Sequence, residues 1–130
     1  MNLLSSVSSE GALDDEESPQ GKASLWVTID DTISPPLQPG TNDDQIIQRY
    51  VLAAFYYATS GDGWTNGNGW LGSSNECEWV RVDCSCDVVT VLEPYANNLD
   101  GSIPTELGSL DSLGKDELLL IYIDIGPLSI

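Results

Sequence analysis

The chain has no histidine, and only four lysine and arginine residues stand against 21 aspartate and glutamate residues. Without histidine it lacks the usual proton carrier near neutral pH and the commonest zinc ligand, which excludes Ser-His, Cys-His and histidine-metal catalysis. The formal net charge of -17 repels phosphate backbones and anionic lipid head groups. We therefore expect no enzyme activity, no nucleic-acid partner and no direct membrane contact by this chain.

Long apolar runs are also missing. The most apolar stretch, Leu118 to Ile130, carries Asp124 and is shorter than the roughly 20 residues that a membrane-spanning helix needs. The amino terminus, MNLLSSVSSEGALDDEE, has neither the basic region nor the apolar region of a signal peptide. We expect neither a transmembrane segment nor a signal peptide in this chain as written.

The first part of the chain is poor in core-forming residues. Residues 1–17 are Ser-rich and then acidic, so they bury too little apolar area to offset the entropy of ordering, and we expect a disordered lead-in. Residues 18–42 predict a short helix, with Ser18 as N-cap and Pro19 at the first helical position, followed by a Pro-rich connector.

The clearest helix lies in NDDQIIQRYVLAAFYYATSGDG. Apolar residues recur there every three or four positions, Asp43 and Asp44 supply a cap and complement the helix dipole, and Gly61 ends the run. The stretch GDGWTNGNGWLGSSNE predicts a Gly- and Asn-rich loop anchored by tryptophans. The β-branched residues 87–94 predict a strand that breaks near Pro94.

The sequence VTVLEPYANNLDGSIPTELGSL carries the leucine-rich repeat pattern L-x-x-L-x-L-x-x-N-x-L with a following G-x-I-P. The positions that would hold one coil together are Val89, Leu92, Asn97, Leu99, Gly101, Ile103 and Pro104. In such a coil the apolar residues fill the interior, and the Asn side chain bonds backbone groups where the strand turns. The glycine permits a tight bend.

On these residues the chain resembles the plant-type leucine-rich repeat proteins, and in particular the N-terminal cap that precedes their first repeat. That cap reads as an amphipathic helix, a Trp-bearing loop, C-x-W-x-G-V-x-C and a first strand, and the order is the same here. The pieces SPQGKASLW and QRYVLAAFYYATSGDGW are similar to the leucine-rich repeat proteins of diatoms. The resemblance implies an α/β fold in which residues 43–88 form a solenoid cap, and residues 89–113 form the first repeat and the start of a second.

The chain departs from the family pattern at three places. Arg81 stands where the cap motif usually has glycine, and Pro94 replaces the last core leucine of the strand. Residues 114–130 form a divergent apolar tail without N-x-L or G-x-I-P, whereas a solenoid needs about three repeats to cover its core. We interpret the chain as a truncated member with a foreign tail. The alternative is that the tail is a closing strand beside VTVLEP.

All three cysteines fall in CEWVRVDCSC. A zinc site would need a fourth ligand that histidine cannot supply here, so we expect no metal. The resemblance implies a disulfide between Cys77 and Cys84. Cys86 is then left over, and competition for Cys77, pairing with another chain and a free thiol all stay open.

Two further features have competing interpretations. The tryptophans Trp26, Trp64, Trp70 and Trp79 are interpreted as core residues, with an exposed sugar-binding platform as the alternative. The loop DGWTNGNG is interpreted as a turn, because the glutamate that an EF-hand requires at its twelfth position is absent. We expect no cofactor.

The resemblance implies a non-catalytic module for protein or ligand recognition, which caps and starts a leucine-rich repeat solenoid. Its concave strand face would present Val91, Glu93 and Tyr95 to a protein or peptide ligand. Family members of this kind are extracellular or membrane-anchored. The alternative function is the extracellular fragment of a receptor-like kinase involved in signalling.

Overall fold

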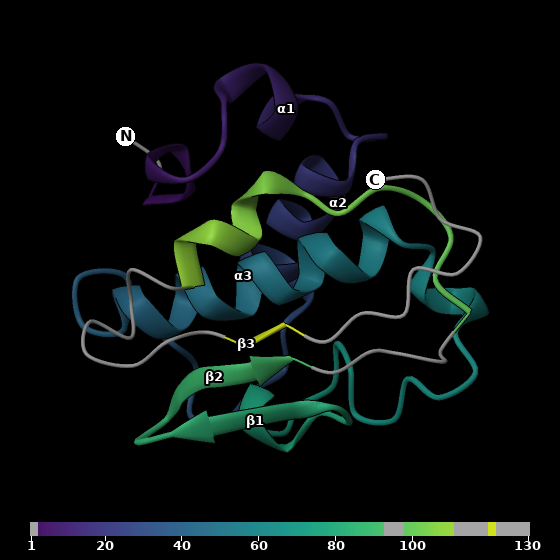
Figure 1. Cartoon of the computed structure of the whole chain (residues 1–130). Helices are drawn as coiled ribbons and strands as arrows, with labels where there is room; N and C mark the ends of the chain where they lie inside the picture. Colours follow the sequence, from purple (N-terminus) through teal and green to yellow (C-terminus); the bar gives the residue numbers. More distant parts are fainter. Residues whose placement is uncertain (1–2, 93–97, 111–119, 122–130) are drawn as a thin grey trace.

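The computed structural model describes residues 3–92, 98–110 and 120–121 (Figure 1). Its helices are α1 (Glu10–Asp14), α2 (Pro19–Leu25) and α3 (Asp43–Ala58), and its strands are β1 (Val82–Ser85), β2 (Val88–Leu92) and β3 (Leu120–Ile121). A π-helical turn, Trp26–Asp30, follows α2, and short 3-10 turns lie at Leu3–Ser6, Gly61–Gly63, Glu76–Glu78 and Thr105–Leu107. This part of the chain is a small mixed α/β unit with α3 at its centre.

The long helix α3 confirms the prediction from apolar periodicity. Its middle is buried on nearly every side, because α2, the N-terminal segment, the tryptophan loop and the sheet all pack around it (Figure 1). The predicted cap is wrong: the N-cap is Asn42, while the Asp43 carboxylate accepts from the backbone N–H of Gly40 at 2.6 Å. The helix ends at Ala58, before Gly61.

The predicted start of α2 is confirmed. The hydroxyl of Ser18 accepts from the backbone N–H of Gly21 at 2.9 Å, and Pro19 occupies the first turn. A Cβ on Gly21 would lie 1.9 Å from the carbonyl oxygen of Asp15, so this position requires glycine. The π-helical turn after α2 carries Trp26 into the core, where it is 5% exposed.

The N-terminal segment differs from the disordered lead-in that we expected for residues 1–17. From residue 3 onward it forms a 3-10 turn and α1, on the side of α3 that faces away from β1 and β2 (Figure 1). Leu4 is 1% exposed, and the hydroxyl of Ser8 is bonded inside the protein. The average composition of the segment conceals these two anchors, which hold it against the core.

The strands β1 and β2 form an antiparallel hairpin, paired from Val82↔Leu92 to Ser85↔Val88. The strand predicted over 87–94 is confirmed at β2, whereas the sequence did not predict β1. The turn between them consists of Cys86 and Asp87, with φ of 52° and 67°. Two positive φ values in a two-residue loop match the twist of a hairpin.

The other edge of β2 pairs with β3 in parallel, with Val91 opposite Leu120 and Leu92 opposite Ile121. Over these two residues the tail follows the closing-strand alternative. The rest of the tail, 114–119 and 122–130, lies outside the described residues.

All four tryptophans belong to the core, which confirms the core interpretation and contradicts the sugar platform. Trp26, Trp64, Trp70 and Trp79 are between 1% and 8% exposed. The indole N–H of Trp64 donates to the carbonyl oxygen of Thr59 at 3.2 Å, and that of Trp70 donates to another backbone carbonyl at 2.8 Å. The loop is therefore anchored by its aromatic residues.

Candidate functional site

The described apolar positions of the predicted repeat pattern are buried or half-buried. Val89, Leu92 and Leu99 are at most 5% exposed, Pro104 is buried and Ile103 is half-buried. Asn97 lies outside the described residues.

Gly101 brings the repeat segment against the carboxyl end of α3. Its φ is 134°, and a Cβ there would lie 2.0 Å from the carbonyl oxygen of Ala58. The backbone N–H of Asp100 donates to the carbonyl oxygen of Thr59 at 3.0 Å, and the hydroxyl of Ser60 donates to the carbonyl oxygen of Asp100 at 2.9 Å. Only glycine allows this close approach.

The predicted concave face is described at one position. Val91 is half-buried on β2, while Glu93 and Tyr95 lie outside the described residues. The role of these three side chains in ligand contact stays a prediction.

The disulfide between Cys77 and Cys84 is confirmed, with 5.6 Å between the two Cα atoms. It joins the turn after the tryptophan loop to β1. Closing a loop of this length lowers the entropy of the unfolded chain, which stabilises the folded protein by about 2.5 kcal/mol. Cys86 has an exposed free thiol in the hairpin turn.

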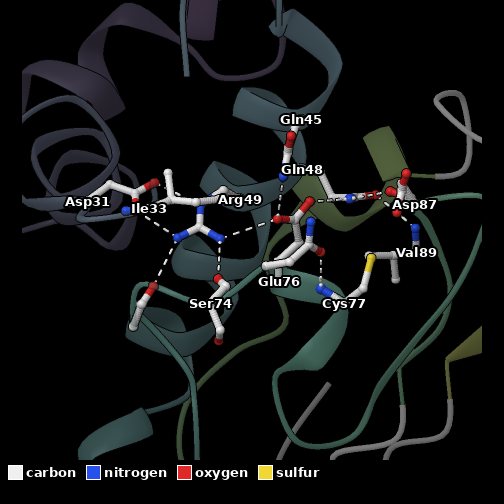
Figure 2. A network of polar contacts seen from close by, with 12 residues as sticks. Asp31, Ile33, Gln45, Gln48, Arg49, Ser74, Glu76, Cys77, Asp87 and Val89 are labelled. Carbon is white, nitrogen blue, oxygen red and sulfur yellow. Dashed lines mark hydrogen bonds and ion pairs between the residues drawn. The ribbon is translucent and has the colours of Figure 1, made fainter. Parts of the chain in front are cut away.

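A buried polar network lies between α3 and the tryptophan loop (Figure 2). At its centre is the guanidinium of Arg49, which is fully buried, and each of its five N–H donors has an acceptor. The carboxylate of Asp31 accepts two of these bonds at 2.7 Å, and Glu76 accepts one at 3.3 Å. The remaining two go to the backbone carbonyls of Gly72 at 3.0 Å and Ser74 at 2.9 Å.

Two tryptophan rings enclose this cation. The guanidinium carbon of Arg49 lies 5.2 Å from the ring centroid of Trp26 and 5.1 Å from that of Trp79. Both distances fall within the range of cation–π attraction, which is stronger when water is excluded. Arg49 thereby links the turn after α2 to the loop that precedes β1.

The carboxylate of Glu76 is fully buried as well. Besides Arg49 it accepts from the side-chain amides of Gln48 at 2.5 Å and Gln45 at 3.1 Å. Gln48 also reaches the hairpin, because its Oε1 accepts from the backbone N–H of Val89 at 2.8 Å and its Nε2 donates to the carbonyl oxygen of Asp87 at 3.1 Å. The network therefore extends from Asp31 to the start of β2 (Figure 2).

A second buried cluster lies on the opposite side of α3. The carboxylate of Glu106, 5% exposed, accepts from the hydroxyl of Ser8 at 2.7 Å and the amide of Gln20 at 3.1 Å. Ser8 also shares a hydrogen bond of 2.6 Å with the hydroxyl of Tyr50. Burial raises the pKa of Tyr50 to about 12, with the charge of Glu106 acting in the same direction and the bond to Ser8 opposing it.

The acidic loop weighed as a calcium site uses its oxygens within the protein. Asp62 accepts from the hydroxyl of Tyr56 at 2.6 Å, and Asn66 accepts from the backbone N–H of Asn68 at 3.1 Å. Burial, then the hydrogen bond and charge of Asp62, raise the pKa of Tyr56. Over the residues that the structure describes, no three Asp, Glu or Cys side chains gather as a metal ion would require.

A cavity of about 410 Å³ opens between the Pro-rich connector and the start of the 3-10 turn at Glu76. Its lining includes Asn42, Gln45, Asn75 and a single carboxylate, that of Glu78. General acid–base chemistry would need a second titratable group within reach, and the lining supplies none.

Sequence reasoning missed Gln48, Arg49 and Glu76. Arg49 could have been noticed, because it is one of only four basic residues and stands in the apolar run IIQRYVLAAF. A buried cation needs anionic partners, but the sequence offers 21 acidic residues and no local signal for which of them approach it.

Comparisons of the chain with protein-family models, with curated proteins and with solved structures find no match. None of the helices in the described part of the chain is long and apolar enough to cross a membrane. The site therefore has to be interpreted from its own geometry.

Proposed function

We propose that the chain is a non-catalytic recognition module that caps and starts a leucine-rich repeat solenoid of the plant type. The observation that carries the proposal is the packing of the repeat positions. Val89, Leu92 and Leu99 share one core with α3, and Gly101 places the repeat segment on the end of that helix. A cap has to cover the first coil with such a surface, because a solenoid end otherwise exposes its apolar interior.

The position of Arg81 supports the same proposal. The cap motif has glycine there, and in this chain Arg81 has a φ of 71°, a conformation that favours glycine. The backbone thus has the shape that the motif residue would require, although the side chain differs.

The outer edge of β2 supports a solenoid that continues. Successive strands of a leucine-rich repeat solenoid pair in parallel, and β3 pairs with β2 in parallel. A protein or peptide ligand would lie across strands added at this edge. The disulfide is compatible with an extracellular location.

A fusion tests this function. Residues 1–110 are placed ahead of a designed plant-type leucine-rich repeat array that has no N-terminal cap. We expect the fused array to be monomeric and to unfold several degrees above the bare array, because its first coil is covered. The control fusion carries an unrelated acidic domain of equal charge. Equal behaviour of the two fusions would reject the proposal.

A further inference from the structure

The outer edge of β2, which faces away from β1, begins with an unusual hydrogen-bond partner. The side-chain amide of Gln48 accepts from the N–H of Val89 and donates to the carbonyl of Asp87, at 2.8 and 3.1 Å. Gln48 is 3% exposed and projects from α3 (Figure 2). The bond to Val89 is therefore shielded from water, whereas the bond to Asp87 is partly buried.

These two bonds reproduce one rung of a parallel β-ladder. In such a ladder one residue donates to the carbonyl that precedes the residue opposite, and accepts from the N–H that follows it. The amide of Gln48 makes both bonds around Val88. The side chain thus occupies the place of one residue in a neighbouring parallel strand.

The next rungs on the same edge belong to β3. The pairing of β1 with β2 is irregular at Thr90, between Val89 and Val91, so the edge is followed here from its pairing with β3. Val91 pairs with Leu120 in parallel orientation. The partner strand therefore pairs from Val91 onward, two residues after the N–H that Gln48 occupies.

We propose that Gln48 is the positioning residue of this edge: it fills the first rung and so sets the register in which one parallel strand adds to β2. The occupant in this chain is Leu120–Ile121. The neighbouring register that this arrangement would exclude is a strand displaced by two residues toward Val89. It would require the N–H of Val89, which Gln48 already holds. The proposal rests on the proposed function, since it specifies how the solenoid would begin.

Gln45 provides a matched control. It lies one turn earlier on α3 and, like Gln48, donates to the carboxylate of Glu76, at 3.1 Å. Among the residues that the structure describes, it makes no hydrogen bond to the hairpin. Gln45→Met removes only a side-chain hydrogen bond to Glu76. Gln48→Met removes such a bond and also the two bonds to the hairpin.

The test uses NMR on the isotope-labelled full chain. In the unaltered protein we expect a through-hydrogen-bond coupling from the Val89 amide nitrogen to the side-chain carbonyl carbon of Gln48, and one set of cross-strand contacts between Val91 and Leu120. In Gln48→Met we expect a second set, between Val89 and Leu120. We also expect hydrogen exchange of the Val89 amide to be about tenfold faster than in Gln45→Met, because the amide has lost its acceptor.

Two results would overturn the proposal. One is the absence of the Val89 to Gln48 coupling in the unaltered protein, a measurement that does not depend on the folding of any variant. The other is a folded Gln48→Met protein with the single Val91 to Leu120 register. Either result is distinct from failure of the capping function, which the fusion measures separately.

Discussion

Two neighbouring residues of α3, Arg49 and Tyr50, belong to two buried polar clusters whose carboxylates have different kinds of partner. Around Arg49 a buried cation meets the carboxylates of Asp31 and Glu76. Around Tyr50 the carboxylate of Glu106 is met by a hydroxyl and an amide. We refer to these as the Arg49 cluster and the Glu106 cluster.

The difference predicts unequal tolerance to change. In the Arg49 cluster each donor faces a fixed acceptor, so a lost partner leaves a buried charge exposed to a low-dielectric interior. In the Glu106 cluster the hydroxyls of Ser8 and Tyr50 can rotate, so Ser8 can donate to Glu106 or, after a change at Glu106, to Tyr50. We therefore expect substitutions in the Arg49 cluster to cost more stability than substitutions in the Glu106 cluster.

The clusters also join different parts of the chain. The Arg49 cluster ties α3 to the tryptophan loop and the hairpin, while the Glu106 cluster ties α3 to the N-terminal segment and to the repeat segment. Substitutions in the two clusters thus compare how firmly each side of α3 is held.

The largest effect is expected from Arg49→Met. Methionine keeps much of the side-chain volume between the two tryptophan rings, but Glu76 loses its buried cationic partner. Removing one partner of a buried ion pair typically costs about 3–5 kcal/mol. The free energy of unfolding, measured by urea denaturation, should fall by this amount. A loss below about 1 kcal/mol would show that the Arg49 cluster is not what holds the tryptophan loop.

An isosteric pair, Glu76→Gln and Glu106→Gln, compares the clusters directly. At Glu76 all three partners are N–H donors. The amide of Gln48 cannot flip without losing Val89, and a flip of Gln45 would still leave the new NH₂ group facing Arg49. We expect a cost of about 3 kcal/mol there. At Glu106 the hydroxyl of Ser8 can accept instead, and the cost should stay below about 1 kcal/mol. Equal costs in urea denaturation would refute the distinction.

Tyr50→Phe tests the Glu106 cluster by pH. The folded-state pKa of Tyr50 is about 12 against an ordinary 10.0, so its contribution is complete below pH 10 and is lost as the pH rises toward 12. The variant should lose about 1 kcal/mol at pH 7 with the hydrogen bond to Ser8. Between pH 10 and 12 its stability should then fall less steeply than that of the unaltered protein. Parallel pH profiles would contradict the assignment.

The sequence predicts the elements that depend on local pattern. The periodicity of α3, the Ser18 and Pro19 start of α2 and the β-branched run of β2 are all confirmed, because neighbouring residues decide each of them. The strand β1 was not predicted, since it depends on pairing with β2 and on positive φ at Cys86, which a non-glycine residue seldom adopts.

Neither cluster could be predicted, because their partners lie far apart in the chain. Glu76 follows Arg49 by 27 residues, and Glu106 follows Ser8 by 98. Such contacts depend on how the elements pack. The disulfide was predicted only through the resemblance to a cap motif, and the geometry then confirmed it.

The smallest effect, and one of opposite sign, is expected from Arg81→Gly. Arg81 is exposed, and its φ of 71° costs a residue with a side chain about 1 kcal/mol. Glycine removes this cost, but part of the gain is lost because glycine gives the unfolded chain more conformational freedom. We expect a gain of about 0.5 kcal/mol over Arg81→Ala, which removes the same side-chain contacts but keeps the strained backbone. Because Arg81 belongs to neither cluster, the gain should add equally to Glu76→Gln and to Glu106→Gln in urea denaturation. A gain that appears only beside Glu106→Gln would mean that the Arg49 cluster, and not the motif position, determines this backbone conformation.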